Sequence, residues 1–135
     1  MKQRIHTSEM LADGGRDGRV EAAGDADLTV QLSTRDDSKA VTPEHLFAGA
    51  YAACYLEALK HALEKSHLSA EGVTVIARVH LDETESGDYQ LTVELRASLP
   101  GLSESEGKHI MNLAHQSCPY SRATRGHARV DLEFD

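Results

Sequence analysis

Residues 42–65 read TPEHLFAGAYAACYLEALKHALEK, and apolar side chains recur in them at steps of three and four. That spacing predicts a long helix with an apolar face. Thr42 suits the N-cap, Pro43 the first helical position, and Glu44 the positive end of the helix dipole. Residues 46–56 carry almost no charge, so we expect this half of the helix to be enclosed on several sides.

Cys54 lies in the apolar half of the predicted helix, one turn from Ala50 and one turn from Ala58. Small neighbours leave space beside a thiol, but free cysteines are among the most buried residues, and packing explains most of them. The helix by itself therefore favours an inert core cysteine. Gly49 interrupts the helical run and marks a candidate kink.

Length and composition set the class of protein. The chain has 135 residues, a formal net charge of −8 and 40% hydrophobic residues, which suits one soluble domain over residues 1–135. The acidic balance disfavours a nucleic-acid partner, because phosphate binding needs a basic face. No apolar run approaches the length of a membrane span, and the N-terminus lacks the apolar core of a signal peptide. We therefore expect a cytoplasmic protein with no membrane partner.

The segments before the helix indicate short strands and a glycine turn. Residues 4–11 alternate weakly, and residues 28–32 alternate as a strand. Between them, residues 13–18 hold three glycines, which permit positive φ angles and a close approach of the backbone. Arg16 lies within this turn; it is either aimed at a partner or simply solvated, as most arginines are.

The segments after the helix indicate more sheet and a second helix. Residues 73–81 and 89–97 alternate strictly and predict a β-hairpin with one buried face. A capping box at residues 103–106 opens a helix, which the proline after Cys118 ends. Residues 128–134 alternate as a last strand.

This order of elements predicts an α+β fold, with antiparallel sheet packed on the central helix. The first half of that helix is too apolar to be covered by one small sheet. A second copy of the chain would cover its other side, so we predict a homodimer.

Four segments together point to a known family. In this order and spacing, they resemble the organic hydroperoxide resistance branch of the Ohr/OsmC superfamily, from about residue 4 to residue 134. The segments are GGRDG at 14–18, TPEHLFA at 42–48, YAACY at 51–55 and CPYSRATRG at 118–126. The resemblance implies an OsmC-like fold, in which antiparallel sheets wrap around a long central helix. It also implies an intertwined homodimer with active sites at the subunit interface.

The resemblance further implies a thiol peroxidase that reduces organic hydroperoxides to alcohols. By position, Cys54 matches the peroxidatic cysteine and Cys118 the resolving cysteine. Arg16 matches the arginine that activates the thiolate, and Glu44 the carboxylate that positions this arginine. We expect this chain to bind no cofactor and no metal. The external reductant of the family is dihydrolipoamide or a lipoylated protein.

Physical chemistry supports these roles. The thiolate attacks a peroxide, and burial on an apolar helix works against the thiolate unless a cation offsets it. Arg16 stays charged at any relevant pH, and a carboxylate such as Glu44 would offset the cost of burying that charge. A straight helix separates Glu44 from Cys54 by about 15 Å. The two can act together only if the chain bends near Gly49 or a second subunit contributes.

Some features set substrate range. We expect an apolar pocket near Phe47 and Tyr51 that favours bulky alkyl or lipid peroxides over hydrogen peroxide. The loop before residues 42–45 is shorter and more polar than is usual in the family. His45 and His115 lie near the predicted site, but neither sits in a ligand-spaced cluster, so both are interpreted as solvated or structural.

Three alternatives stay open. The first is a peroxidase of the osmotically inducible branch, with the same two-cysteine chemistry and a different substrate preference. The second is a non-enzymatic binder of a metal or ligand that uses Cys54, Cys118 and a histidine. The third is a structural protein whose cysteines are inert.

Overall fold

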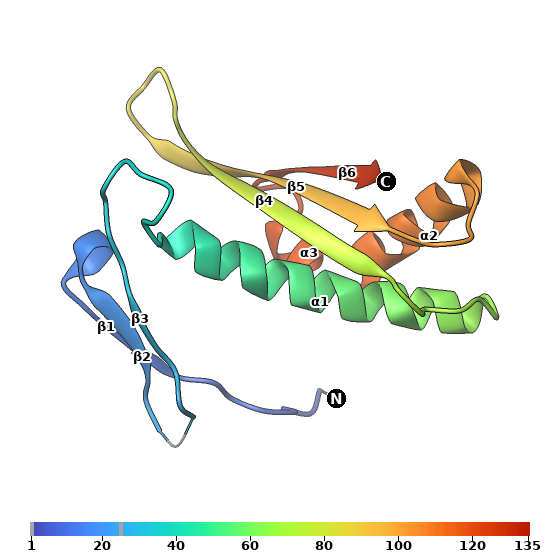
Figure 1. The fold of residues 1–135 in the computed structure, drawn as a ribbon, viewed down its shortest axis with the longest axis horizontal. Helices are drawn as coiled ribbons and strands as arrows, with labels where there is room; N and C mark the ends of the chain where they lie inside the picture. The colour runs from blue at the N-terminus through green and yellow to red at the C-terminus, as the bar shows by residue number, and fades with distance from the viewer. Residues whose placement is uncertain (1, 25) are drawn as a thin grey trace. The chain divides into compact units, whose positions relative to one another are not determined.

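The computed structural model of this chain describes residues 2–24 and 26–135. The chain divides into two compact units, residues 1–43 and residues 44–135 (Figure 1). The single domain expected from the sequence stays a prediction.

The first unit is a small antiparallel sheet with the strand order β1-β2-β3. Its elements are β1 (Met10–Asp13), the 3-10 turn η1 (Gly15–Asp17), β2 (Arg19–Ala22) and β3 (Thr29–Gln31). The strand predicted over residues 4–11 begins only at Met10, and β2 had no predicted counterpart because its four residues are too short for a periodic signal. Leu32 and Ala40 are buried, whereas β1 is exposed along its whole length.

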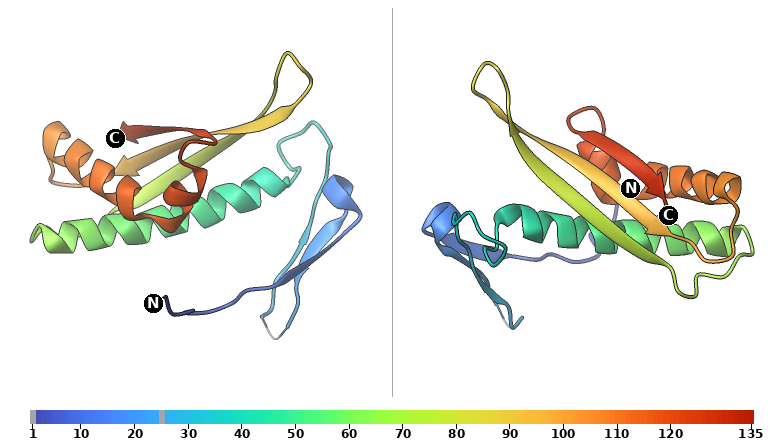
Figure 2. Two further views of the ribbon diagram at one scale, coloured as in Figure 1. Left: turned by 180° about the vertical axis from the view of Figure 1, so that it is seen from behind. Right: turned by 45° about the horizontal axis from the view of Figure 1, so that its top comes forward.

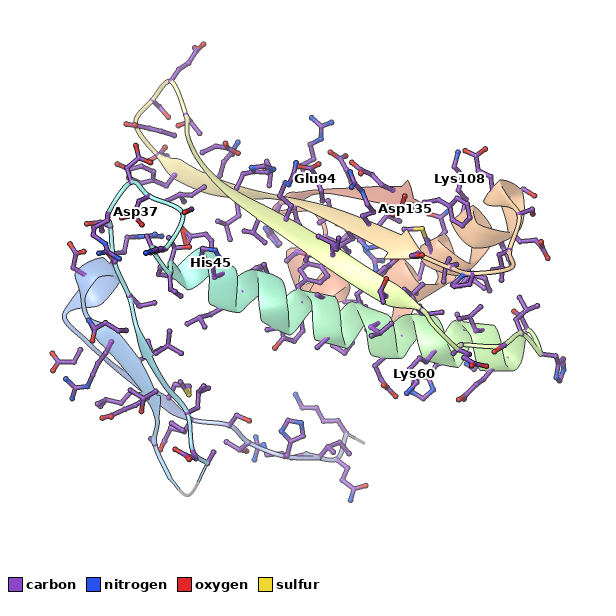
Figure 3. The ribbon with its side chains drawn as sticks, viewed as in Figure 1. Asp37, His45, Lys60, Glu94, Lys108 and Asp135 are labelled. Atoms are coloured by element: carbon purple, nitrogen blue, oxygen red, sulfur yellow. The ribbon has the colours of Figure 1, made fainter. Side chains whose placement is uncertain are left out.

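The second unit packs three helices on a three-stranded sheet. The helices are α1 (Pro43–Lys65), α2 (Glu104–Ser117) and α3 (Pro119–Thr124), and the strands are β4 (Thr74–Glu83), β5 (Tyr89–Ser98) and β6 (Arg129–Phe134). Helices α1 and α2 lie over one face of the sheet (Figures 1 and 2). Lys60 points from α1 away from the sheet (Figure 3), as expected for the polar side of an amphipathic helix.

The sheet is mixed, which corrects the prediction of an antiparallel sheet. Strands β4 and β5 form the predicted antiparallel hairpin, in which Val79 lies opposite Val93. Strand β6 instead pairs parallel to β5, with Val130 opposite Val93. Parallel neighbours need a long crossover connection, and α2 and α3 provide it between the end of β5 and the start of β6.

The core forms between β5 and the two long helices. The inward residues of β5 (Val93, Leu95 and Ala97) are at most 1% exposed, as the strict alternation of this strand predicted. They belong to one cluster with buried residues of α1 and α2, among them Leu59 and Ile110. In α1, the buried residues run from Tyr51 to Leu63. The core therefore buries more of the second half of α1 than of its first half.

The course of α1 at Gly49 and the segment after α2 test the predictions made at Gly49 and Pro119. Helix α1 is unbroken through Gly49, so the candidate kink is absent there (Figure 1). Cys118 does end α2 in an extended conformation, as predicted. A third helix, α3, follows at once and was not predicted, because Pro119 was interpreted only as a helix breaker, although proline also suits the first position of a helix.

Replacing Gly107 with alanine tests the contact between α2 and β6. A Cβ atom at Gly107 would lie 2.0 Å from Cε1 of Phe134, so the ring would have to leave its position. We expect Gly107→Ala to lower the free energy of unfolding by about 1–3 kcal/mol through overpacking, despite the better helix propensity of alanine. Urea unfolding measures the change. His109→Ala adds an alanine at an exposed position of the same helix and should leave stability nearly unchanged; equal effects would contradict the contact.

Candidate active site

The fold brings the two cysteines together, although 64 residues separate them in the chain. The Sγ atoms of Cys118 and Cys54 lie 3.5 Å apart, and the Cys118 thiol donates a hydrogen bond to the Cys54 sulfur. Both cysteines are free thiols; Cys54 is half-buried and Cys118 is fully buried. A half-buried thiol with a second thiol in contact is the arrangement that cysteine redox chemistry uses.

The chain reversal between α2 and α3 places Cys118. Its backbone N–H donates to the carbonyl of Ala114 at 2.8 Å, which closes the last turn of α2. Its φ of −62° and ψ of 123° are extended, as the following proline requires. Cys118 thus caps α2 and precedes the first residue of α3. Because both helices pack in the second unit, the position of the sulfur is fixed from both sides.

The surroundings of Cys54 work against its ionisation. Burial raises the pKa of the Cys54 thiol above its ordinary value. A hydrogen bond from the backbone N–H of Tyr120 lowers this pKa in part, whereas the hydrogen bond and charge of Cys118 raise it. Reactivity at neutral pH therefore calls for a further group that favours the thiolate, such as a cation.

The predicted substrate residues form an aromatic cluster beside the thiols. The ring centroids of Phe47 and Tyr51 are 6.1 Å apart, and those of Tyr51 and Tyr120 are 6.0 Å apart. Tyr51 is fully buried, whereas Phe47 is half-buried and Tyr120 is 41% exposed. The roles of Phe47 and Tyr51 in substrate binding stay predictions.

A groove of about 840 Å³ has Cys54 among its lining residues. Ala58 and Ala62 of α1 and Leu113 of α2 give it an apolar floor, and Glu57 stands among its lining residues. Neither Phe47 nor Tyr51 is among the described residues that line it. The groove thus follows α1 from Cys54 toward its C-terminal end, as far as Lys65.

Glu44 and Arg16 lie elsewhere in the chain. Glu44 is in the first turn of α1, about 15 Å along the unbroken helix axis from Cys54, so the structure does not bring these two residues of one chain together. Arg16 lies in η1 of the first unit. Asp17 fastens this turn by accepting hydrogen bonds from the backbone N–H and hydroxyl of Thr34 at 2.7 and 2.8 Å, which lower the pKa of Asp17. The role of Arg16 at the thiol stays a prediction.

Sequence reasoning missed one polar group beside the thiols. Ser121 of α3 is fully buried and lies 2.7 Å from the hydroxyl oxygen of Tyr51 and 2.8 Å from Nδ1 of His115. The histidine is half-buried, and burial, with a smaller effect of Arg125, lowers the pKa of its imidazole. His45 lies at the start of α1 (Figure 3). A serine three residues after a cysteine carries no signal of burial in the sequence.

Residues 2–24 and 26–135 contain neither a cluster of metal ligands nor a membrane-spanning helix. No three His, Cys, Asp or Glu side chains gather there as a group able to hold a metal ion. Among the helices of these residues, none combines the length and apolar character needed to cross a membrane.

Comparison with known proteins covers nearly the whole chain. Residues 34–133 match the family model described as OsmC-like protein. The organic hydroperoxide resistance protein of Xanthomonas axonopodis pv. citri is 36% identical over 134 residues, which are 95% of this chain and 93% of that protein. The organic hydroperoxide resistance protein OhrA of Bacillus subtilis is 37% identical over 140 residues, covering 98% of each chain.

A solved structure matches as well. The crystal structure of an organic hydroperoxide resistance protein from Legionella pneumophila has a TM-score of 0.89 at 34% identity, covering 98% of this chain and 99% of that chain. This match confirms the expected OsmC-like fold, in which the sheet of the second unit is mixed.

Mild oxidation tests the pairing of the thiols. The two sulfurs are 3.5 Å apart, and a disulfide needs about 2.05 Å, so a small movement closes the bond. We expect diamide to form a Cys54–Cys118 disulfide within one chain, seen by intact mass as the loss of two hydrogen atoms and of both free thiols. Cys54→Ser and Cys118→Ser serve as controls that each keep one thiol. Cross-linking between chains, or two thiols that persist, would contradict the geometry.

Proposed function

This chain belongs to the OsmC-like protein family, in its organic hydroperoxide resistance branch, and from that premise we propose that it is a thiol-dependent peroxidase that reduces organic hydroperoxides to alcohols. The relatives named above carry hydroperoxide resistance in their names. The single observation that carries the mechanism is the 3.5 Å separation of the Cys54 and Cys118 sulfurs.

The proposed reaction has two steps in the protein. The Cys54 thiolate attacks the outer oxygen of the peroxide, the O–O bond breaks, and the departing alkoxide takes a proton to become the alcohol. Cys54 is left as a sulfenic acid. The Cys118 sulfur then attacks the Cys54 sulfur, water leaves, and a disulfide joins the two residues. Dihydrolipoamide or a lipoylated protein, as the family resemblance implies, reduces this disulfide and is itself oxidised to the cyclic disulfide.

The exposed face of α1 supports a homodimer. Gly49, Ala50 and Ala53 are exposed within one chain, and the apolar groove beside Cys54 continues this face along α1. Leu113 of α2, 37% exposed, borders the same groove. Small apolar residues at helical spacing let another helix approach closely. We propose that a second copy of the chain packs here.

Such a dimer could also bring a cation to Cys54, which would favour its thiolate. The unbroken helix keeps Glu44 about 15 Å from Cys54 of its own chain. Without a bend near Gly49, Glu44 can act at Cys54 only if it comes from another subunit. We propose that Arg16 and Glu44 of one copy serve Cys54 of the other. There the guanidinium favours the thiolate and donates to the peroxide oxygens as charge develops on the alkoxide, while the carboxylate orients the guanidinium.

A peroxidase assay coupled to dihydrolipoamide tests the function. We expect turnover of cumene hydroperoxide to exceed that of hydrogen peroxide. Cys54→Ser should lose activity, because it removes the nucleophile. Cys118→Ser should allow one round of oxidation without sustained turnover. Arg16→Ala should lower kcat by about 10²–10³, the range for a lost group that stabilises developing charge.

The control for the arginine is Arg19→Ala. Arg19 is an exposed arginine of the same small unit, paired with Asp13 and Glu21, and its loss should leave turnover close to wild type. Stoichiometric zinc in the purified chain, with no turnover of any peroxide, would instead support the binder alternative. Equal efficiency on the two peroxides would remove the support for an apolar substrate pocket.

A hybrid dimer tests whether the site is shared between copies. Co-expression of one Arg16→Ala copy with one Cys54→Ser copy, on different tags, gives a dimer in which one site has Cys54 from the first copy and Arg16 from the second. We expect this hybrid to regain about half of the wild-type activity per dimer, because one of two equivalent sites is restored. By itself, Cys54→Ser should be inactive and Arg16→Ala should keep at most about 1% of the wild-type activity. A hybrid without activity would mean that Arg16 acts within its own chain.

A further inference from the structure

A buried hydrogen-bond chain joins three helices beside the thiols, and the peroxide chemistry does not use it. The Ser121 hydroxyl of α3 lies 2.7 Å from the Tyr51 hydroxyl of α1 and 2.8 Å from Nδ1 of His115 of α2. Thr124, one turn further along α3, lies 3.3 Å from the same tyrosine hydroxyl. Ser121 and Tyr51 are both fully buried, so water does not compete for the bond between them.

The position of this chain relative to the cysteines is specific. Tyr51 precedes Cys54 by three residues in α1, and Ser121 follows Cys118 by three residues. Residues three apart in a helix lie on the same face. The Tyr51–Ser121 bond and the contact between the two sulfurs therefore tie the same two segments at points one helical turn apart.

Helix α3 needs such an anchor because it is short. It has six residues, too few to be stable by its own backbone bonds. Its first turn begins at Cys118, whose carbonyl accepts a hydrogen bond from the backbone N–H of Arg122 at 3.0 Å. Whatever fixes Ser121 thus fixes the backbone that carries the Cys118 sulfur, and with it the Tyr120 amide that faces Cys54.

We propose that the Tyr51–Ser121–His115 chain is a positioning device that holds α3 so that Cys118 meets Cys54 as soon as Cys54 is oxidised. This device decides between two fates of the oxidised Cys54. A sulfenic acid either condenses with a thiol to form a disulfide and water, or reacts with a second peroxide to form a sulfinic acid. Thiols cannot reduce the sulfinic acid back to the thiol. A Cys118 sulfur that is held close favours the first outcome. This step rests on the proposed function, but the equilibrium of the two thiols does not.

The state of His115 fits this role. Burial first, and Arg125 second, lower the pKa of its imidazole, which favours the neutral ring, and in a neutral ring one nitrogen accepts a hydrogen bond. Of the directions that the geometry allows, we assign the one in which the Tyr51 hydroxyl donates to Ser121 and the Ser121 hydroxyl donates to Nδ1 of His115. Every member of the chain is satisfied in this assignment, which is what a buried polar network requires to hold a segment in place.

Two variants that each remove one oxygen atom test the device. Ser121→Ala deletes the centre of the chain, and Tyr51→Phe deletes one end while keeping the ring. The matched control is Tyr55→Phe. Tyr55 is also fully buried on α1, and its hydroxyl donates to the carbonyl of Met111 in α2 at 2.8 Å. The control therefore loses a buried hydrogen bond of the same kind, next to the same cysteine, without releasing α3.

The first measurement is the equilibrium of the full-length chain with glutathione redox buffers, read as the fraction of Cys54–Cys118 disulfide. We expect Ser121→Ala and Tyr51→Phe to lower the equilibrium constant for disulfide formation by about three- to tenfold, the range that one buried hydrogen bond supports. Ser121→Ala should have the larger effect, because it breaks two bonds. Tyr55→Phe should stay within about twofold of wild type.

The second measurement is the product of oxidation by excess cumene hydroperoxide, read by intact mass as disulfide against sulfinic acid. The sulfinic fraction should rise in the two test variants and not in the control. If both test variants match Tyr55→Phe in both measurements, the positioning role is wrong. If the wild-type chain does not reduce the peroxide at all, the proposed function fails while the glutathione equilibrium still decides the role of the hydrogen-bond chain.

Discussion

The contact between the Cys54 and Cys118 sulfurs, 3.5 Å apart, is the constraint on which the rest of this structure depends. A disulfide can form only if the two atoms approach to about 2 Å without strain, so the helices that carry them have little freedom. The second unit supplies that rigidity. Packing of α1 and α2 on β5 fixes Cys54, and the tight junction between α2 and α3 fixes Cys118. The core keeps this distance short, which the proposed chemistry requires.

The same packing creates a conflict between burial and charge. A thiol enclosed by apolar groups keeps its proton, and the pKa of Cys54 is raised for this reason, yet the proposed reaction needs the thiolate. Only the Tyr120 amide acts against burial among the causes acting on this pKa within the described residues. An arginine is suited to supply the remaining stabilisation, because it keeps its charge in surroundings where a lysine would lose it. Binding of a second copy is one way to bring such a charge to a buried sulfur.

Hydrogen bonds between buried polar groups fix the positions of the helices in this core. Ser121 is fully buried, yet its hydroxyl has two partners, and Tyr55 likewise donates to a backbone carbonyl of α2. Burial raises the pKa of Tyr55 far above its ordinary value, so its hydroxyl stays a neutral donor. Apolar contacts set which faces meet, but they tolerate sliding. Directional bonds remove that tolerance where the position of an atom matters.

The sequence by itself determined α1, the β4–β5 hairpin, the capping box of α2 and the choice of the two cysteines, because each rests on local periodicity or on a short motif. It left β2 unseen because its four residues are too short for a periodic signal, and α3 because Pro119 was interpreted only as a helix breaker. Only the tertiary structure decided that β6 runs parallel to β5, that α1 passes Gly49 without a bend, and that Ser121 joins Tyr51 to His115. The pairing of β6 and the bonds of Ser121 depend on contacts between residues far apart in the chain, and no local pattern of side chains encodes which distant partner a strand or a hydroxyl will meet.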